Sequence, residues 1–324
     1  MSKKLGVGLA VFILFFVALV LVTRYALLET GAAEGFPGRG DRVALIHVEG
    51  TILGSMEGGN SLFSGLIASS VEIVRMLETA RKDPRIKAVV LRVNSPGGSA
   101  AASQEVYAEV KRVKAEKPVV VSMGDLAASG GYYISSAATK VYASPATLTG
   151  SIGVIFSSLE FSGLMEDLGI TSQTVTAGEY KDIASMYRKM TAAERGMLEK
   201  LVGEVHAQFI AAVAEGRGME EGQVRKLATG MIMTGAQAKE ANLVDDLGGL
   251  ESAESEARAL AKLPEDAPVV AYQKRRSVFD IFDFLGSSRA PMDPSGSLLS
   301  PQDSLTRFVQ RLLRCDVGVD LLGG

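Results

Sequence analysis

The sequence predicts an α/β fold in which most strands are parallel. Short runs rich in β-branched residues alternate with longer stretches whose apolar residues recur every three or four positions, which is typical of β-α units. Apolar residues make up 47% of the 324 residues and charged residues 22%, the composition of a globular protein with a proper core. The chain is long enough for one large domain or two ordinary ones.

An uncharged stretch near the N-terminus predicts a membrane anchor. Residues 5–22 read LGVGLAVFILFFVALVLV, and a helix of this length nearly spans the ~30 Å hydrocarbon core of a bilayer. A cleaved signal peptide is the alternative, but the run is long for one, and Arg24 follows it without a clear small-residue cleavage site. Lys3 and Lys4 favour a cytoplasmic N-terminus. We therefore expect a cytoplasmic segment at residues 1–4, a transmembrane signal anchor at 5–23, and the remaining residues outside the cytoplasm.

Composition divides those remaining residues into three parts. Residues 24–41 are rich in glycine and small residues and predict a linker. Residues 42–272 carry the alternating strand and helix patterns and form the expected domain. Residues 273–324 combine amphipathic stretches with a segment rich in proline, serine and glycine, which predicts a tail.

Strands and one helix of the domain can be placed from their patterns. The strands are expected at residues 42–48, 87–93, 118–123, 140–144, 151–156, 172–177 and 231–235. An amphipathic helix is expected over residues 66–82. Its face toward the sheet would carry Ile67, Val71, Val74 and Leu77.

A second helix has the clearest start signal in the chain. Thr191 and Glu194 have the spacing of a capping box, in which a hydroxyl and a carboxylate satisfy free amides of the first turn. Gly216 and Gly218 suit the C-terminal end of this helix.

Composition excludes several classes of function. A net charge of -3 and a pI near 5.7 give no global basic field, so we expect no nucleic acid partner. The only cysteine, Cys315, excludes a disulfide framework and a multi-cysteine metal site. His47 and His206 are the only histidines, and their apolar or helical surroundings indicate structural roles. A nucleophile in this chain therefore needs a base other than histidine.

Two glycine-rich loops follow expected strands and precede expected helices. They are NSPGGS at residues 94–99 and DLAASGGYY at residues 125–133, and the second contains Ser129. Such turns present free backbone N–H groups that can bind an anion, including the oxyanion of a tetrahedral intermediate. The alternative is that the glycines only make tight turns and allow close packing of helices.

Lysine is the remaining side chain that could activate this serine. The lipase-type motif Gly-x-Ser-x-Gly is absent, because Ala127 stands two residues before Ser129. A lysine base needs a pKa lowered from ~10.4 toward ~7 to 8, which costs roughly 4 kcal/mol. The pattern does not choose among the lysines. Lys181 lies in a loop, and Glu179 and Asp182 beside it would by themselves keep it charged.

Several sequence blocks together resemble a known family. RVNSPGG, VVVSMGDLAASGGYYISSAA, LTGSIGVI and GEYKD occur in this order within residues 43–272. They resemble the signal peptide peptidase A family, bacterial membrane-anchored Ser/Lys proteases, in its shorter single-repeat form. The resemblance implies that Ser129 is the nucleophile, that Lys181 is its general base and that Ser151 orients the lysine amine. It further implies an oxyanion hole made by the N–H of Gly130 and one N–H from Gly97 or Gly98.

The same resemblance implies an architecture, an assembly and a substrate. The fold would be a spiral of β-β-α units as in the Clp protease and crotonase superfamily, and the subunits would form a ring-shaped homo-oligomer with active sites possible across subunit boundaries. The chain would be a serine endopeptidase that degrades remnant signal peptides at the bacterial cell membrane, with no metal and no cofactor. The alternatives are a protease of other membrane or envelope peptides, a crotonase-like acyl-CoA enzyme, and a catalytically silent scaffold.

Overall fold

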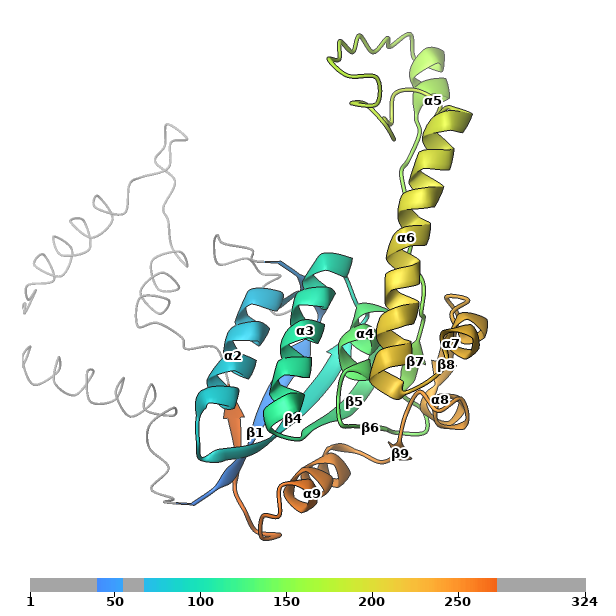
Figure 1. The fold of residues 1–324 in the computed structure, drawn as a ribbon. Helices are drawn as coiled ribbons and strands as arrows, with labels where there is room; N and C mark the ends of the chain where they lie inside the picture. Colours follow the sequence, from blue (N-terminus) through green and yellow to red (C-terminus); the bar gives the residue numbers. More distant parts are fainter. Residues whose placement is uncertain (1–39, 55–66, 273–324) are drawn as a thin grey trace, which may run out of the picture. The chain divides into compact units, whose positions relative to one another are not determined.

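An eight-stranded sheet organises the part of the chain that the structure describes, residues 40–54 and 67–272 of a computed structural model (Figure 1). The strand order is β10-β1-β4-β5-β6-β9, with β7 beside β5 and β8 beside β7. These pairs are parallel except β7 with β8. The bounds are β1 Arg42–Glu49, β4 Ile86–Ser95, β5 Val119–Ala128, β6 Lys140–Ala143, β7 Leu148–Gly150, β8 Ile232–Thr234, β9 Asp246–Leu247 and β10 Val269–Tyr272. Two further strands, β2 (Thr51–Leu53) and β3 (Ile67–Ser69), pair with each other. The predicted α/β class with mostly parallel strands is confirmed.

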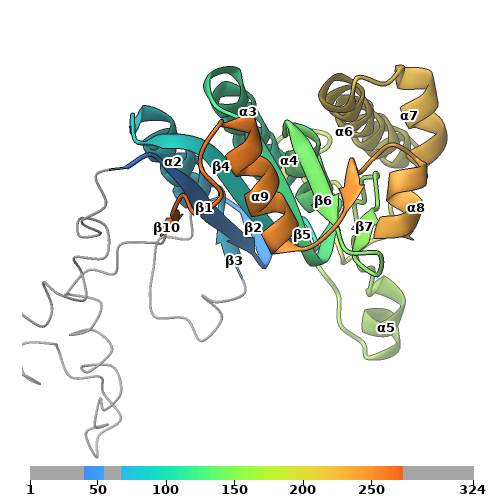
Figure 2. The ribbon, with the colours of Figure 1, turned by 90° about the horizontal axis from the view of Figure 1, so that it is seen from below.

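Helices cover both faces of the sheet. Figure 2 shows α9 (Leu250–Leu260) on one face, and α2 (Ser70–Lys82), α3 (Ala100–Glu116) and α4 (Gly130–Ser136) on the other. The long α6 (Ala192–Arg217) packs on α4 through its C-terminal half, where the rings of Phe209 and Tyr133 lie 4.8 Å apart. Three short helices complete the described elements: α5 (Ser162–Asp167), α7 (Glu221–Leu227) and α8 (Gly235–Glu240).

The central strands are apolar on both sides because each side faces helices. In β4, Val89, Leu91 and Val93 belong to the larger core under α2, α3 and α4, whereas Ala88 and Val90 pack with α9. Continuous β-branched runs are characteristic of parallel strands buried on both faces. The central strands are therefore fixed from both sides, and the loops at their carboxyl ends have a rigid base.

Five of the seven predicted strands are confirmed, and two predictions are wrong. β1, β4, β5, β6 and β8 occupy the expected places, although β5 continues to Ala128, into the segment expected to be a loop. No strand forms at residues 151–156 or 172–177, where the chain has no sheet partner among the described residues. Val175 in the second segment is 98% exposed. β-branched residues fit a pleated, half-buried surface, and this single chain offers no such surface there.

Both predicted helices form, but the first begins later than predicted and buries a different set of residues. α2 begins at Ser70, because residues 67–69 form β3 and Ser69 caps the helix. Its buried face carries Ile73, Leu77 and Ala80, so the expected burial of Val71, which is 52% exposed, is wrong. α6 has the predicted capping box, and Gly218 ends it in the left-handed conformation at φ 64°.

The membrane-anchor prediction falls on residues that the structure does not describe. Within residues 40–54 and 67–272, none of the helices is both apolar enough and long enough to cross a bilayer. The predicted anchor at 5–23, the linker up to residue 39 and the tail at 273–324 lie outside the described residues.

Candidate active site

Ser129 sits in a strained turn between β5 and α4. Its backbone angles are φ 52° and ψ -120°, which non-glycine residues rarely adopt and which cost roughly 1–3 kcal/mol. The turn is held by hydrogen bonds from the Ser129 N–H to the Gly150 carbonyl at 2.9 Å and from the Tyr133 N–H to the Ser129 carbonyl at 2.8 Å. The side chain is half-buried. The fold thus fixes the serine where a strand ends, with part of its surface open to solvent.

The Gly97 loop lies directly against this turn. A Cβ atom at Gly97 would lie 2.5 Å from the Gly130 nitrogen and 2.9 Å from the Ser129 Cβ, and φ at Gly97 is +94°. A Cβ at Gly130 would lie 2.4 Å from Ser103 Oγ and 3.3 Å from the Gly98 nitrogen. Only glycine allows this approach, which brings the Gly98 and Gly130 amides together beside the serine.

The amides of these glycines differ in their hydrogen bonds. The Gly97 N–H donates to Ser95 Oγ at 3.1 Å. Ile52 bonds the loop on one side, donating its N–H to the Gly97 carbonyl and accepting from the Ser99 N–H, and this bridge leaves the Gly98 N–H on the other side. In the part of the chain that the structure describes, neither the Gly98 N–H nor the Gly130 N–H meets an acceptor. Two such donors beside a serine can bind a developing oxyanion.

Ser151 occupies the matching position on the neighbouring strand. β7 pairs with β5 so that Gly150 lies opposite Ala128, and Ser151 and Ser129 are the next residues of the two strands. Ser151 also has a positive φ, 50°, and its N–H donates to the Met231 carbonyl at 2.8 Å. Its Oγ lies 3.3 Å from the Gly230 carbonyl. The two serines are therefore neighbours at one edge of the sheet.

Lys181 lies in a different part of the chain. It is exposed and belongs to a series of turns in which its N–H donates to the Gly178 carbonyl at 3.2 Å. Among the described residues, its amine has neither a hydrogen-bond acceptor nor an ion-pair partner.

Arg188 holds the Lys181 turn at the N-terminal end of α6. Its guanidinium bonds Asp182, the residue after Lys181, and Glu194 in the first turn of α6. The half of α6 that packs on α4 begins near Phe209, roughly 22 Å further along the helix at ~1.5 Å per residue. Within one chain, Lys181 is therefore not brought to Ser129, and the structure joins only Ser129, Ser151 and the glycine amides.

Comparison with known proteins decides the family. The model of peptidase family S49 matches residues 111–264, which include Ser129, Ser151 and Lys181. A relative from Enterococcus faecium with the provisional name signal peptide peptidase SppA is 36% identical over 253 residues, 78% of this chain and 71% of the relative.

The chain belongs to peptidase family S49.

Two more relatives extend this result. A relative from Methanocaldococcus jannaschii, which carries the provisional name of a protease, is 34% identical over 249 residues, 76% of this chain and 80% of the relative. Protease 4 of Salmonella typhi is 37% identical over 267 residues, which are 81% of this chain but only 42% of that longer protein. This S49 chain is thus a serine protease, as the sequence blocks predict.

Two residues of the S49 site region escape sequence reasoning. Ser95 fixes the Gly97 loop through its hydroxyl, and Arg188 fixes the turn that contains Lys181. The signal for Arg188 is its spacing of six residues from both Asp182 and Glu194. Residues six apart lie on different faces of a helix and about 20 Å apart along a strand, so this spacing predicts no contact by itself.

Proposed function

We propose that this serine protease is a membrane-tethered endopeptidase that cleaves apolar signal peptides with a Ser129/Lys181 dyad. The observation that carries the proposal is Ser129 in a strained turn beside the unpaired amides of Gly98 and Gly130. Named relatives supply the substrate class: one carries the provisional name signal peptide peptidase SppA. The domain at residues 42–272 would be a spiral of β-β-α units held to the bacterial membrane by residues 5–23, on the extracytoplasmic side.

The chemistry follows from these roles. Ser129 Oγ attacks the scissile carbonyl carbon while its proton passes to the neutral Lys181 amine. The amides of Gly130 and Gly98 hold the resulting oxyanion, each at a benefit of ~3 kcal/mol in barrier height. We choose Gly98 over Gly97 because the Gly97 N–H already donates to Ser95. Collapse breaks the C–N bond, the lysine protonates the leaving amine, and water then releases the acyl group by the same route.

The lysine of each site would come from a neighbouring subunit of a ring-shaped homo-oligomer, with Ser151 orienting its amine. Support for this arrangement is that Lys181 is held at the far end of α6 from α4. The segment around it also exposes many large apolar side chains, more than a monomer usually leaves in water. They are Ile155, Leu159, Leu164, Leu168, Ile170, Val175, Met197 and Leu201.

Peptidase turnover by the full chain in detergent micelles tests the dyad. The substrate is an internally quenched peptide with the apolar core of a signal sequence. We expect Ser129→Ala and Lys181→Ala each to lower kcat/KM by about 10³-fold or more, with the assembly intact by size. Lys189→Ala, which removes another exposed lysine of the same segment, should keep wild-type turnover. Turnover that survives Ser129→Ala or Lys181→Ala would contradict the mechanism and show that another nucleophile or base acts, whereas a wild type without turnover would favour an acyl-CoA enzyme or a silent scaffold.

A further inference from the structure

One guanidinium group lies between two carboxylates beside the Lys181 turn. We infer that Arg188 is a positioning residue for the lysine base: it ties the turn to α6 and keeps the Asp182 carboxylate engaged, so that Asp182 does not pair with the lysine amine. This inference rests on the proposed function, in which Lys181 accepts the Ser129 proton.

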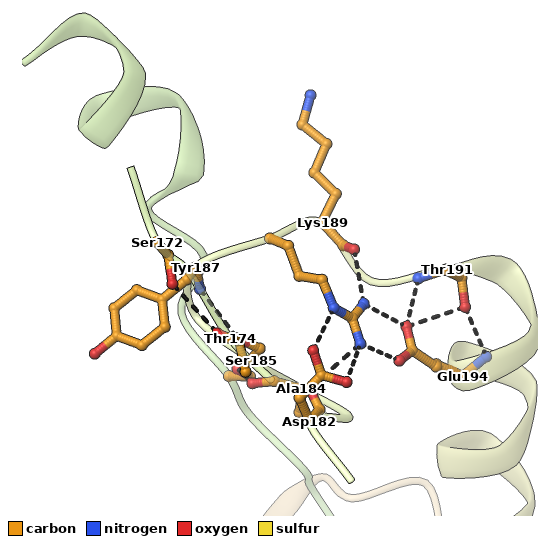
Figure 3. Close-up of polar contacts among 11 residues, drawn as sticks. Ser172, Thr174, Asp182, Ala184, Ser185, Tyr187, Lys189, Thr191 and Glu194 are labelled. Atoms are coloured by element: carbon orange, nitrogen blue, oxygen red, sulfur yellow. Dashed lines mark hydrogen bonds and ion pairs between the residues drawn. The ribbon is translucent and has the colours of Figure 1, made fainter. Parts of the chain in front are cut away.

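The contacts form a bridge rather than a single ion pair. Arg188 Nε donates to Asp182 Oδ2 at 2.7 Å and Nη2 donates to Asp182 Oδ1 at 2.8 Å, so both carboxylate oxygens are used. Along another edge of the planar guanidinium, Nη1 donates to Glu194 Oε2 at 2.9 Å. The dashed lines in Figure 3 that end on Asp182 and Glu194 include these hydrogen bonds. Only arginine has the planar fork of donors that such a bridge needs, because a lysine amine is a point charge.

Glu194 gives the bridge a fixed end. Its carboxylate accepts from the Thr191 N–H at 2.8 Å and from Thr191 Oγ1 at 3.0 Å, and the residue is only 3% exposed. Hydrogen bonds from Arg188, and then from the Thr191 backbone, lower the pKa of Glu194 to about 2. The Arg188 hydrogen bond likewise lowers the pKa of Asp182. Both carboxylates are therefore charged at neutral pH, and both are hydrogen-bonded to the same guanidinium.

The turn itself has little other support. Residues 178–184 form no helix or strand, and the backbone bonds here are local, such as Ser185 N–H to the Asp182 carbonyl at 2.9 Å. Ser158 Oγ donates to the Ala184 carbonyl at 2.8 Å, which links the turn to the preceding segment but not to α6. In the described ranges, Asp182 is the turn's only hydrogen-bonded link, through Arg188, to the first turn of α6. Besides its carboxylate, its backbone carbonyl accepts from Arg188 Nη2 at 3.4 Å. Since Asp182 follows Lys181 directly, this link sets where the lysine backbone lies.

The charges near Lys181 explain why the bridge matters for chemistry. Glu179, Tyr180 and Asp182 belong to the same turn, and Glu194 and Arg188 face it from the start of α6 and the segment before it. The Lys189 side chain points away from the cluster (Figure 3). A free carboxylate within ~4–6 Å favours the charged form of an amine and raises its pKa by about 1 unit or more. With Arg188 in place, Asp182 is occupied and the lysine amine is left without an acidic partner among the described residues.

The test compares pH profiles of peptide turnover by the full chain in micelles. The kcat/KM of the wild type should rise with pH as the lysine loses its proton. Arg188→Gln should move this rise upward by about one pH unit, so that kcat/KM at pH values below the rise falls about tenfold. Arg188→Lys keeps one charge without the fork and should show the same direction of shift. In the double variant Asp182→Asn/Arg188→Gln, the rise should return toward its wild-type pH, because the Asp182 carboxylate is gone. Its plateau kcat/KM should still lie below that of the wild type, because the turn is no longer tied to α6. Arg195→Gln removes the exposed arginine that follows Glu194 in α6, and its pH profile should match that of the wild type.

The outcomes separate this inference from the dyad. If Lys181→Ala is inactive but Arg188→Gln, folded and assembled by size, keeps the wild-type pH profile, the inference about Arg188 fails alone. It also fails if Arg195→Gln shifts the profile as much as Arg188→Gln, since the loss of any positive charge in this region would then explain the shift. If Lys181→Ala is fully active, both the dyad and the inference fail. Should Arg188→Gln not fold, Arg188→Lys and the Asp182→Asn single variant decide the question through the plateau and the pH of the rise.

Discussion

At the scale of single residues, the conformation of Ser129 matters as much as its hydroxyl. A serine with φ 52° and ψ -120° stores strain that the surrounding hydrogen bonds hold in place. Glycine would adopt these angles without that cost, so the position trades stability for a side chain. Strain at a single polar residue, next to unpaired amides, is typical of a site where the chain needs the side chain itself.

Replacing Ser129 by glycine or alanine separates strain from chemistry. Both variants should be inactive, but Ser129→Gly should exceed Ser129→Ala in free energy of unfolding by ~1 kcal/mol, because strain relief outweighs the added entropy of the unfolded chain. Thermal unfolding of the full chain measures the difference. Ser255, exposed within α9, is the control: there the glycine variant should be the less stable by ~1 kcal/mol. Equal stabilities of the two Ser129 variants would show that the turn carries no strain.

At the scale of elements, α6 has two halves with different surroundings. Its C-terminal half carries the buried Phe209, Ile210 and Val213, whereas Leu201 in the other half is 54% exposed. One continuous helix therefore joins the core to the turn of Lys181. Its length, rather than any loop, sets how far that turn extends from the sheet.

Alanine substitutions along α6 should distinguish these halves. Ile210→Ala removes a fully buried side chain and should lower the free energy of unfolding by ~2–5 kcal/mol. Leu201→Ala should change the unfolding of the dissociated subunit by less than ~0.5 kcal/mol, yet weaken self-association. Denaturant unfolding and sedimentation of each variant give the two quantities. A loss of subunit stability at Leu201 as large as that at Ile210 would mean that the helix is buried along its whole length within one chain.

The elements that the sequence predicts well are those whose partners lie within the same chain. β1, β4 and β5 are apolar on both faces and form where their patterns predict them, and Thr191 with Glu194 marks the start of α6 because capping is local. The segment 172–177 has the composition of a strand but no strand beside it among the described residues of this chain. The same reason limits how much of the site can be predicted from the sequence. The glycine loops predict the neighbourhood of Ser129, whereas no local pattern connects Lys181 to it.

At the scale of the whole molecule, a lone subunit contains all the proposed catalytic residues but does not bring them together. Ser129, Ser151 and the glycine amides gather at the end of β5 and β7, while Lys181 is fixed at the far end of α6. A second copy could supply the missing amine and cover the exposed apolar side chains in one step. Activity would then depend on assembly.

Mixing two inactive variants tests this dependence. In a ring containing Ser129→Ala and Lys181→Ala chains, some sites would combine an intact serine from one chain with an intact lysine from its neighbour. When the variants are co-produced in equal amounts with different tags, about a quarter of the sites should be active. Turnover of the mixed assembly, measured beside each parent variant, gives the fraction. No recovery in verified mixed rings would show that both residues act within one subunit.

The place of β10 has a consequence for how the protein is made. β1 begins at Arg42, yet one of its two edges is closed only by β10, with Val43 opposite Val269 and Ile46 opposite Tyr272. During synthesis the first strand must therefore wait, unpaired on that side, until more than two hundred further residues have emerged. An apolar edge left open for so long invites pairing with other chains. A nascent chain cut short before Val269 would carry that edge permanently, so cellular quality control has a reason to remove incomplete copies.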